Sequence, residues 1–102
     1  MFNVNEKTLD AYQQKVRAQI KEMKAKMQLL EAGAEKTSAD MRIKYQKNLD
    51  DWKSRFKDVE TRLEKLSNSA ESSLDDIRSG IDKAMNELSR SIENATKQLN
   101  NQ

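Results

Sequence analysis

Large apolar residues recur along the first part of the chain with the period of a heptad. Two columns, four positions apart, repeat every seven residues, which is the spacing of the a and d positions of a coiled coil. Gln13 takes one slot of the second column and is its only polar exception before position 41. The first column is Leu9, Val16, Met23, Leu30 and Thr37, and the second is Ile20, Met27, Ala34 and Met41.

The period changes after Met41, where Tyr45 and Leu49 follow in steps of four. From there the apolar residues recur every eleven positions, or about 3.67 residues per turn, which favours a straight or slightly right-handed arrangement of helices. The chain therefore predicts an all-α fold with heptads first and eleven-residue repeats afterwards. The eleven-residue columns are Trp52, Leu63, Leu74, Met85; Val59, Ala70, Ile81, Ile92; and Leu66, Ile77, Leu88, Leu99.

Ser and Asn residues between positions 67 and 73 indicate a helix break, because their side chains compete for backbone hydrogen bonds. We predict a long coiled-coil hairpin with helices at about 4–66 and about 70–99. The alternative is a three-helix bundle with an extra break near 32–38, where Thr37 and Asp40 resemble a capping box. The hairpin is favoured because the heptad register passes through this segment without losing a residue.

In the hairpin, the second helix covers only about half of the first, so we expect a second copy of the chain to cover the rest. A homodimer is favoured over larger assemblies. Charge supports the fold, since residues 1–66 carry 15 basic and 11 acidic side chains and residues 67–102 carry 4 and 6. The predicted interaction seam is Leu9, Val16, Ile20, Met23, Met27, Leu30, Met41, Tyr45, Leu49, Trp52, Phe56, Val59, Leu63, Leu66, Leu74, Ile77, Ile81, Met85, Leu88, Ile92 and Leu99.

Composition excludes much chemistry. The 102 residues include no His, Cys or Pro, and their net charge is +2. There is thus no disulfide, no Cys/His zinc site, no thiol nucleophile and no imidazole base. Asp75 and Gly80 briefly resemble a calcium loop, but Asn86 stands where a carboxylate is required. We therefore expect a protein that is not an enzyme, with no catalytic residues, no cofactor and no bound metal.

Charge and periodicity also bear on whether nucleic acid or a membrane surface is a partner. Lys21, Lys24 and Lys26 form no basic block, because Glu22 interrupts them, so nucleic acid is not expected. The apolar face of residues 70–99 could lie on a membrane surface, but it lacks aromatic residues and its polar face is acidic on balance. A protein seam is favoured. Without a recognisable signal peptide or membrane span, we expect a cytoplasmic protein.

Three segments carry a resemblance that covers nearly the whole chain: residues 5–15, 40–45 and 74–84. They resemble a family of small bacterial all-helical coiled-coil proteins, loosely described as stress-response proteins. The resemblance implies a helical protein linked to stress, and it implies no catalytic residues. The expected function is a structural or protective one exerted through self-association. The alternatives are a lipid- or granule-surface binder of the apolipoprotein or phasin kind, or an adaptor that docks a partner helix.

Overall fold

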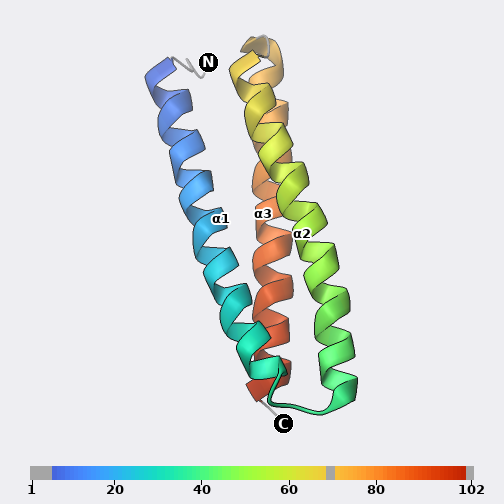
Figure 1. Ribbon diagram of the computed structural model, residues 1–102. Coiled ribbons are helices and arrows are strands. Elements are labelled where there is room, and N and C mark those ends of the chain that lie inside the picture. The colour runs from blue at the N-terminus through green and yellow to red at the C-terminus, as the bar shows by residue number, and fades with distance from the viewer. Residues whose placement is uncertain (1–5, 69–70, 101–102) are drawn as a thin grey trace.

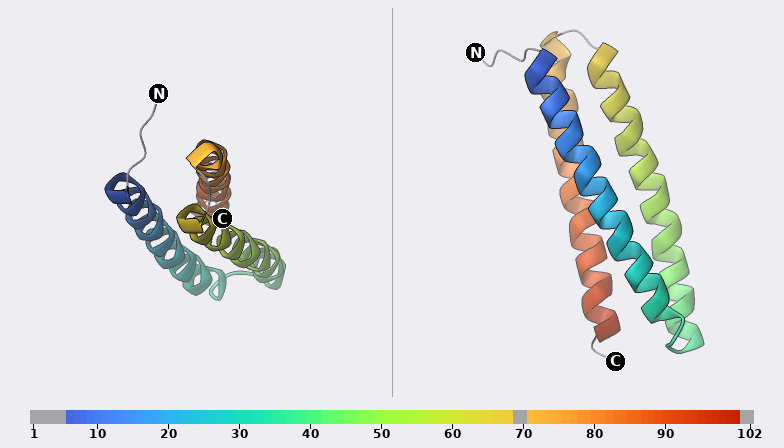
Figure 2. Two further views of the ribbon diagram at one scale, coloured as in Figure 1. Left: turned by 90° about the horizontal axis from the view of Figure 1, so that it is seen from above. Right: turned by 60° about the vertical axis from the view of Figure 1, so that its left-hand side comes forward.

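The computed structural model describes residues 6–68 and 71–100, and this part of the chain folds into three helices and no strand. Helix α1 spans Glu6–Ala34, α2 spans Ala39–Asn68 and α3 spans Glu71–Asn100. Each helix contacts both others, and together they form an elongated bundle of 52 × 18 × 18 Å. Helix α2 runs antiparallel to the other two, so α1 and α3 are parallel (Figures 1 and 2). The all-α prediction is confirmed.

The predicted continuous helix over 4–66 is wrong, because the chain turns at residues 35–38. The carbonyls of Gly33 and Ala34 accept hydrogen bonds from the amides of Lys36 and Thr37, at 3.2 and 3.1 Å. The Thr37 hydroxyl also donates to the Ala34 carbonyl, at 2.7 Å. These short-range bonds satisfy carbonyls at the end of α1 that a continuing helix would have used. The alternative break near 32–38 therefore fits the structure.

Helix α2 is capped by Ser38 rather than by Thr37, since the Ser38 hydroxyl accepts a hydrogen bond from the backbone amide of Met41 at 3.4 Å. The second break lies where it was predicted, with α2 ending at Asn68 and α3 beginning at Glu71. The predicted helix starts at 4 and 70 fall outside the described residues.

The break at 35–38 has a simple physical cause. No large apolar side chain stands between Leu30 and Met41, so a helix through this segment would bury almost nothing there. Ala34 and Thr37 keep the heptad count, which made the register look continuous, but one is small and the other polar. With the chain folded back, the seam of α1 is covered by α2 and α3 of the same chain. The half-covered helix that required a second copy does not arise.

The core is a single cluster that runs along the bundle, and all three helices contribute to it. Its spacing follows the sequence repeats, because residues three and four apart share one helical face. Burying each such side chain stabilises the fold by about 1.5–3 kcal/mol. The largest fully buried side chains are Trp52, Leu63, Leu66, Ile81, Leu88, Val16 and Val59.

Two aromatic residues of α2 join it to both neighbours. The Tyr45 and Trp52 rings meet edge to face, with centroids 6.0 Å apart and planes at 77°. The Tyr45 hydroxyl donates to the Met27 carbonyl of α1 at 2.6 Å. The Trp52 indole N–H donates to the Ser91 hydroxyl of α3 at 2.8 Å. Both polar atoms of this pair are thereby satisfied, and both bonds fix α2 against a particular level of its neighbours.

Gln13, the polar exception in the heptad seam, links α1 to α2. Its side-chain amide donates to the Leu63 carbonyl at 2.9 Å and to the Ser67 hydroxyl at 3.0 Å. Because hydrogen bonds depend on distance and angle, these two bonds fix the position of α1 along α2 more strictly than apolar contacts would. The polar residue therefore has a structural role.

We predict that Gly80→Ala stabilises the protein. Gly80 lies inside α3, where glycine costs about 0.5–1 kcal/mol relative to alanine. An added Cβ would lie 2.6 Å from Nη1 of Arg62, which is the end of a flexible side chain and can move. Chemical denaturation should show a gain of about 0.5–1 kcal/mol in the free energy of unfolding. A loss of stability would mean that the Arg62 guanidinium is held firmly over the α3 backbone.

Candidate interaction surfaces

A hollow of about 910 Å³ lies between the C-terminal halves of the parallel helices α1 and α3. Leu30, Met85 and Ile92 form its buried floor. Leu29 borders it with 74% of its surface exposed, which is high for a large apolar residue beside other apolar groups. Half-buried Met23 adds to the apolar surface. We call this the α1/α3 groove. The charged side chains along it are Glu22, Lys26, Glu93 and Lys97.

The two helices of this groove are held in a fixed register at both ends. Near the start of α1, the Tyr12 hydroxyl donates to the Asp82 carboxylate at 2.7 Å, and the Arg78 guanidinium lies 4.7 Å from the Tyr12 ring centroid. Near its end, Gly33 admits the Leu99 side chain, since a Cβ there would lie 2.6 Å from Leu99 Cδ2. Each residue of α1 is therefore level with the residue of α3 about 66 positions later.

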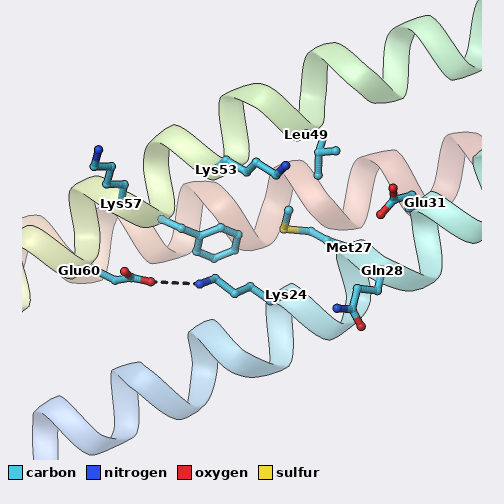
Figure 3. Close-up of a pocket in the computed structure, with 9 residues that line it drawn as sticks. Lys24, Met27, Gln28, Glu31, Leu49, Lys53, Lys57 and Glu60 are labelled. Atoms are coloured by element: carbon cyan, nitrogen blue, oxygen red, sulfur yellow. Dashed lines mark hydrogen bonds and ion pairs between the residues drawn. The ribbon is translucent and has the colours of Figure 1, made fainter.

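A second groove runs between the antiparallel helices α1 and α2 (Figure 3). One hollow of about 380 Å³ has Met27, Leu49 and Phe56 beneath it, and Lys53 and Lys57 along the α2 side. An adjoining hollow of about 470 Å³ is lined by Arg17, Ile20 and Lys21. The two share Lys24, Gln28 and Glu60, so they form one continuous surface, which we call the α1/α2 groove.

Lys24 and Glu60 bridge the α1/α2 groove. Their charged groups are 3.1 Å apart, and the side chains point toward one another across the groove in Figure 3. The Lys24 ammonium also lies 5.7 Å from the centroid of the Phe56 ring. Both side chains are about half exposed, so the pair is screened by water and contributes little to stability.

The predicted seam residues lie inside a single chain. Most of them are buried, and the half-buried members are Leu9, Met23, Met41, Ile77 and Leu99. The structure thus brings the seam together as the core of the bundle, with the exception of Met41, which lies outside the core cluster. The apolar face of α3, which the lipid hypothesis requires, is part of that core, so binding to lipid through it would require the bundle to open.

Several surface features were missed from the sequence. Leu29 lies one position before the seam residue Leu30. The heptad pattern places it outside the two apolar columns, so it was not singled out. Lys53 and Lys57 are distant in sequence from Arg17, Lys21 and Lys24, and only the antiparallel packing of α1 and α2 gathers them. A search for basic side chains at i, i+4 on neighbouring helices could have found part of this cluster.

The described residues also bear on metal binding and on membrane spanning. Within 6–68 and 71–100, no three carboxylates come close enough to hold a metal ion together. In the same part of the chain, no helix combines the length and the apolarity that a membrane span needs. Comparisons of the chain with protein-family models, curated proteins and solved structures gave no match.

Both tyrosines that cross between helices have perturbed acidity. Burial, with a smaller effect of the Glu31 carboxylate, raises the pKa of Tyr45 from 10.0 to about 12. Burial also raises the pKa of Tyr12, assisted by its hydrogen bond to Asp82 and by the negative charge of that carboxylate. In each case the folded state favours the neutral phenol over the phenolate.

We predict that stability falls in strong alkali because of these two phenols. A group whose pKa is raised in the folded state contributes its full stabilisation below its unfolded pKa, here 10.0. The contribution of Tyr45 is lost as the pH rises from about 10 to about 12, and that of Tyr12 from about 10 upward. Urea denaturation at about pH 9 and about pH 11 should show the loss.

The Tyr12→Phe and Tyr45→Phe variants test this origin, since each removes one phenol and leaves every other ionisable side chain in place. Each variant should be less stable at about pH 9, by about 1 kcal/mol for the lost hydrogen bond. Each should then lose less stability than the wild type between the two pH values. Equal losses in all three proteins would contradict the assignment.

Proposed function

We propose that this chain is a non-enzymatic interaction protein that self-associates through the α1/α3 groove. The observation that carries the proposal is the exposure of Leu29 beside the apolar floor of this groove. Isolated apolar residues on a surface are common, but Leu29 lines the same hollow as the half-buried apolar residues Met23 and Leu99. Such a surface is suited to receive helices packed as in a larger bundle.

Size supports a second copy as the occupant. One long side of the bundle measures about 52 by 18 Å, on the order of the ~800 Å² that each partner buries in a stable protein interface. The groove occupies the half of that face nearer the C-terminal ends of α1 and α3, so pairing two such faces would bury Leu29 of both copies against the apolar residues of the groove, where an apolar anchor contributes most.

Charge supports the same occupant. With a twofold axis parallel to the helices, α1 of each copy packs over α3 of the other. Each residue of α1 lies at about the same height along the bundle as the α3 residue 66 positions later. Lys26 therefore lies at the height of Ile92, next to Glu93. The dimer would then pair Lys26 of one copy with Glu93 of the other, twice. Such pairs at an interface rim favour one orientation more than they add affinity.

We predict that Leu29→Lys separates the copies. Light scattering should give about twice 11.8 kDa for the wild type, and about 11.8 kDa for the variant at the same concentration. A lysine in this apolar contact is expected to weaken association at least about 30-fold, the effect of a typical hot-spot residue. Because Leu29 is 74% exposed in the single chain, the variant should fold normally, as circular dichroism can show.

Ile43→Lys is the matched control, since Ile43 is 57% exposed on α2 and borders neither groove. It should leave the dimer intact. A wild type of 11.8 kDa at all concentrations, or equal effects of the two substitutions, would overturn the proposal. Helicity that appears only when vesicles are added would instead favour the lipid-binding alternative.

The link to stress is part of the same proposal, and its support is the resemblance to small bacterial stress-response proteins. We predict that a strain deleted for this chain survives salt or oxidative stress less well, and that wild type and Ile43→Lys restore survival. Leu29→Lys should restore it poorly, because the dimer is the proposed working form. Full rescue by Leu29→Lys at equal protein level would separate the function from self-association.

A further inference from the structure

Positive charge is concentrated in the α1/α2 groove. Five basic side chains line it, namely Arg17, Lys21, Lys24, Lys53 and Lys57, against two acidic ones, Glu31 and Glu60. Five minus two gives +3, whereas the whole chain carries +2, so the rest of the chain sums to −1. The groove is therefore the basic side of a molecule that is otherwise slightly acidic, and it should attract an acidic partner.

The shape of the groove restricts what that partner can be. Its lining on α1 extends from Arg17 to Glu31, which corresponds to about 21 Å or four helical turns. Its floor is already covered, because Ile20, Met27 and Phe56 are only 5, 7 and 2% exposed. Burial of apolar surface can therefore supply only part of the binding of any occupant, and the charged rims must supply the rest. A helix of four or more turns fits the length and can use the basic rims.

We propose that the α1/α2 groove binds an acidic amphipathic helix of a partner protein. Its carboxylates would pair with Lys21 on α1 and with Lys53 and Lys57 on α2, while its apolar side rests on the floor between them. A helix laid in a groove between two others completes a four-helix arrangement. The concave groove suits a convex helix better than a flat anionic membrane, which makes contact mainly with ridges.

Glu60 acts in this arrangement as a resident competitor. Its carboxylate holds the Lys24 ammonium at 3.1 Å, in the place that an incoming carboxylate would take. Exchange of one exposed carboxylate for another costs little, because the resident pair is screened and weak. Removing the charge of Glu60 should therefore strengthen the binding of the partner helix.

This surface is independent of the proposed self-association. Lys53 and Lys57 line the α1/α2 groove and do not line the α1/α3 groove, so the dimer leaves them available. The Leu29→Lys variant should bind the acidic helix as the wild type does. The two proposals can therefore fail independently, and the experiments show which of them has failed.

The probe is a fluorescent synthetic peptide of about 20 residues, helical, with leucines on one face and glutamates flanking it. A matched peptide carries lysines in place of the glutamates. Fluorescence anisotropy at low ionic strength should show saturable binding of the acidic peptide and none of the basic one. Raising the salt to about 0.3 M should weaken binding several-fold, because the rim contacts are exposed charges.

Matched charge changes assign the site. Lys53→Glu with Lys57→Glu should raise the Kd at least about tenfold. Lys47→Glu with Lys83→Glu alters the net charge equally at exposed positions outside the groove, and it should change the Kd by less than about twofold. Glu60→Gln should lower the Kd about two- to fivefold, whereas Asp76→Asn on α3 should not. Circular dichroism checks that each variant is folded.

Three results would overturn the proposal: no binding of the acidic peptide, equal loss in both charge-reversed pairs, or no gain from Glu60→Gln. The last experiment measures cosedimentation of the protein with vesicles that contain anionic phosphatidylglycerol. Cosedimentation with these vesicles that needs Lys53 and Lys57, without peptide binding, would replace the partner helix by a membrane surface.

Discussion

The bundle depends on the contact that α2 makes with its two neighbours through Tyr45 and Trp52. The two rings meet edge to face inside the bundle, and each has one polar atom that must be satisfied there. Tyr45 meets this need on the backbone of α1 and Trp52 on a serine of α3. Apolar contacts alone would tolerate sliding of one helix along another, whereas these directional bonds hold α2 at one level of each partner. The remaining core then packs in register.

The same arrangement decides which surfaces stay available. Large apolar side chains at core positions are buried by packing within the chain. Of the two large apolar side chains that stay mostly exposed in the described residues, Leu29 and Ile43, only Leu29 borders a groove, the one where α1 meets α3. There Leu29 lies just off the buried stripe, and the small Gly33 lets Leu99 approach α1 closely. Between α1 and α2, exposed lysines line the groove above a buried apolar floor. One groove is therefore apolar at its edge, and the other is basic.

These two characters lead to different kinds of recognition. Contact through the α1/α3 groove would be driven by removal of apolar surface from water, which depends little on salt. Contact through the α1/α2 groove would be driven by exposed charges, which salt weakens. The two proposed contacts do not exclude each other, because the grooves lie on different sides of α1.

The apolar spacing determined that the chain is helical and which residues enter the core, and the Ser and Asn residues between 67 and 73 located the second break. The lack of His and Cys likewise limited the available chemistry. The spacing could not decide whether the chain turns after Ala34, because Ala34, Thr37 and Met41 keep the heptad count whether or not a helix connects them. Tertiary packing decided it: two helices of about thirty residues cover each other's faces, whereas one long helix leaves half its face in water. Packing also placed Lys53 and Lys57 along the same groove as Arg17 and Lys21, and it placed Gln13 against Leu63. Periodicity describes one helix at a time, and contacts between helices distant in sequence exist only once the chain has folded back on itself.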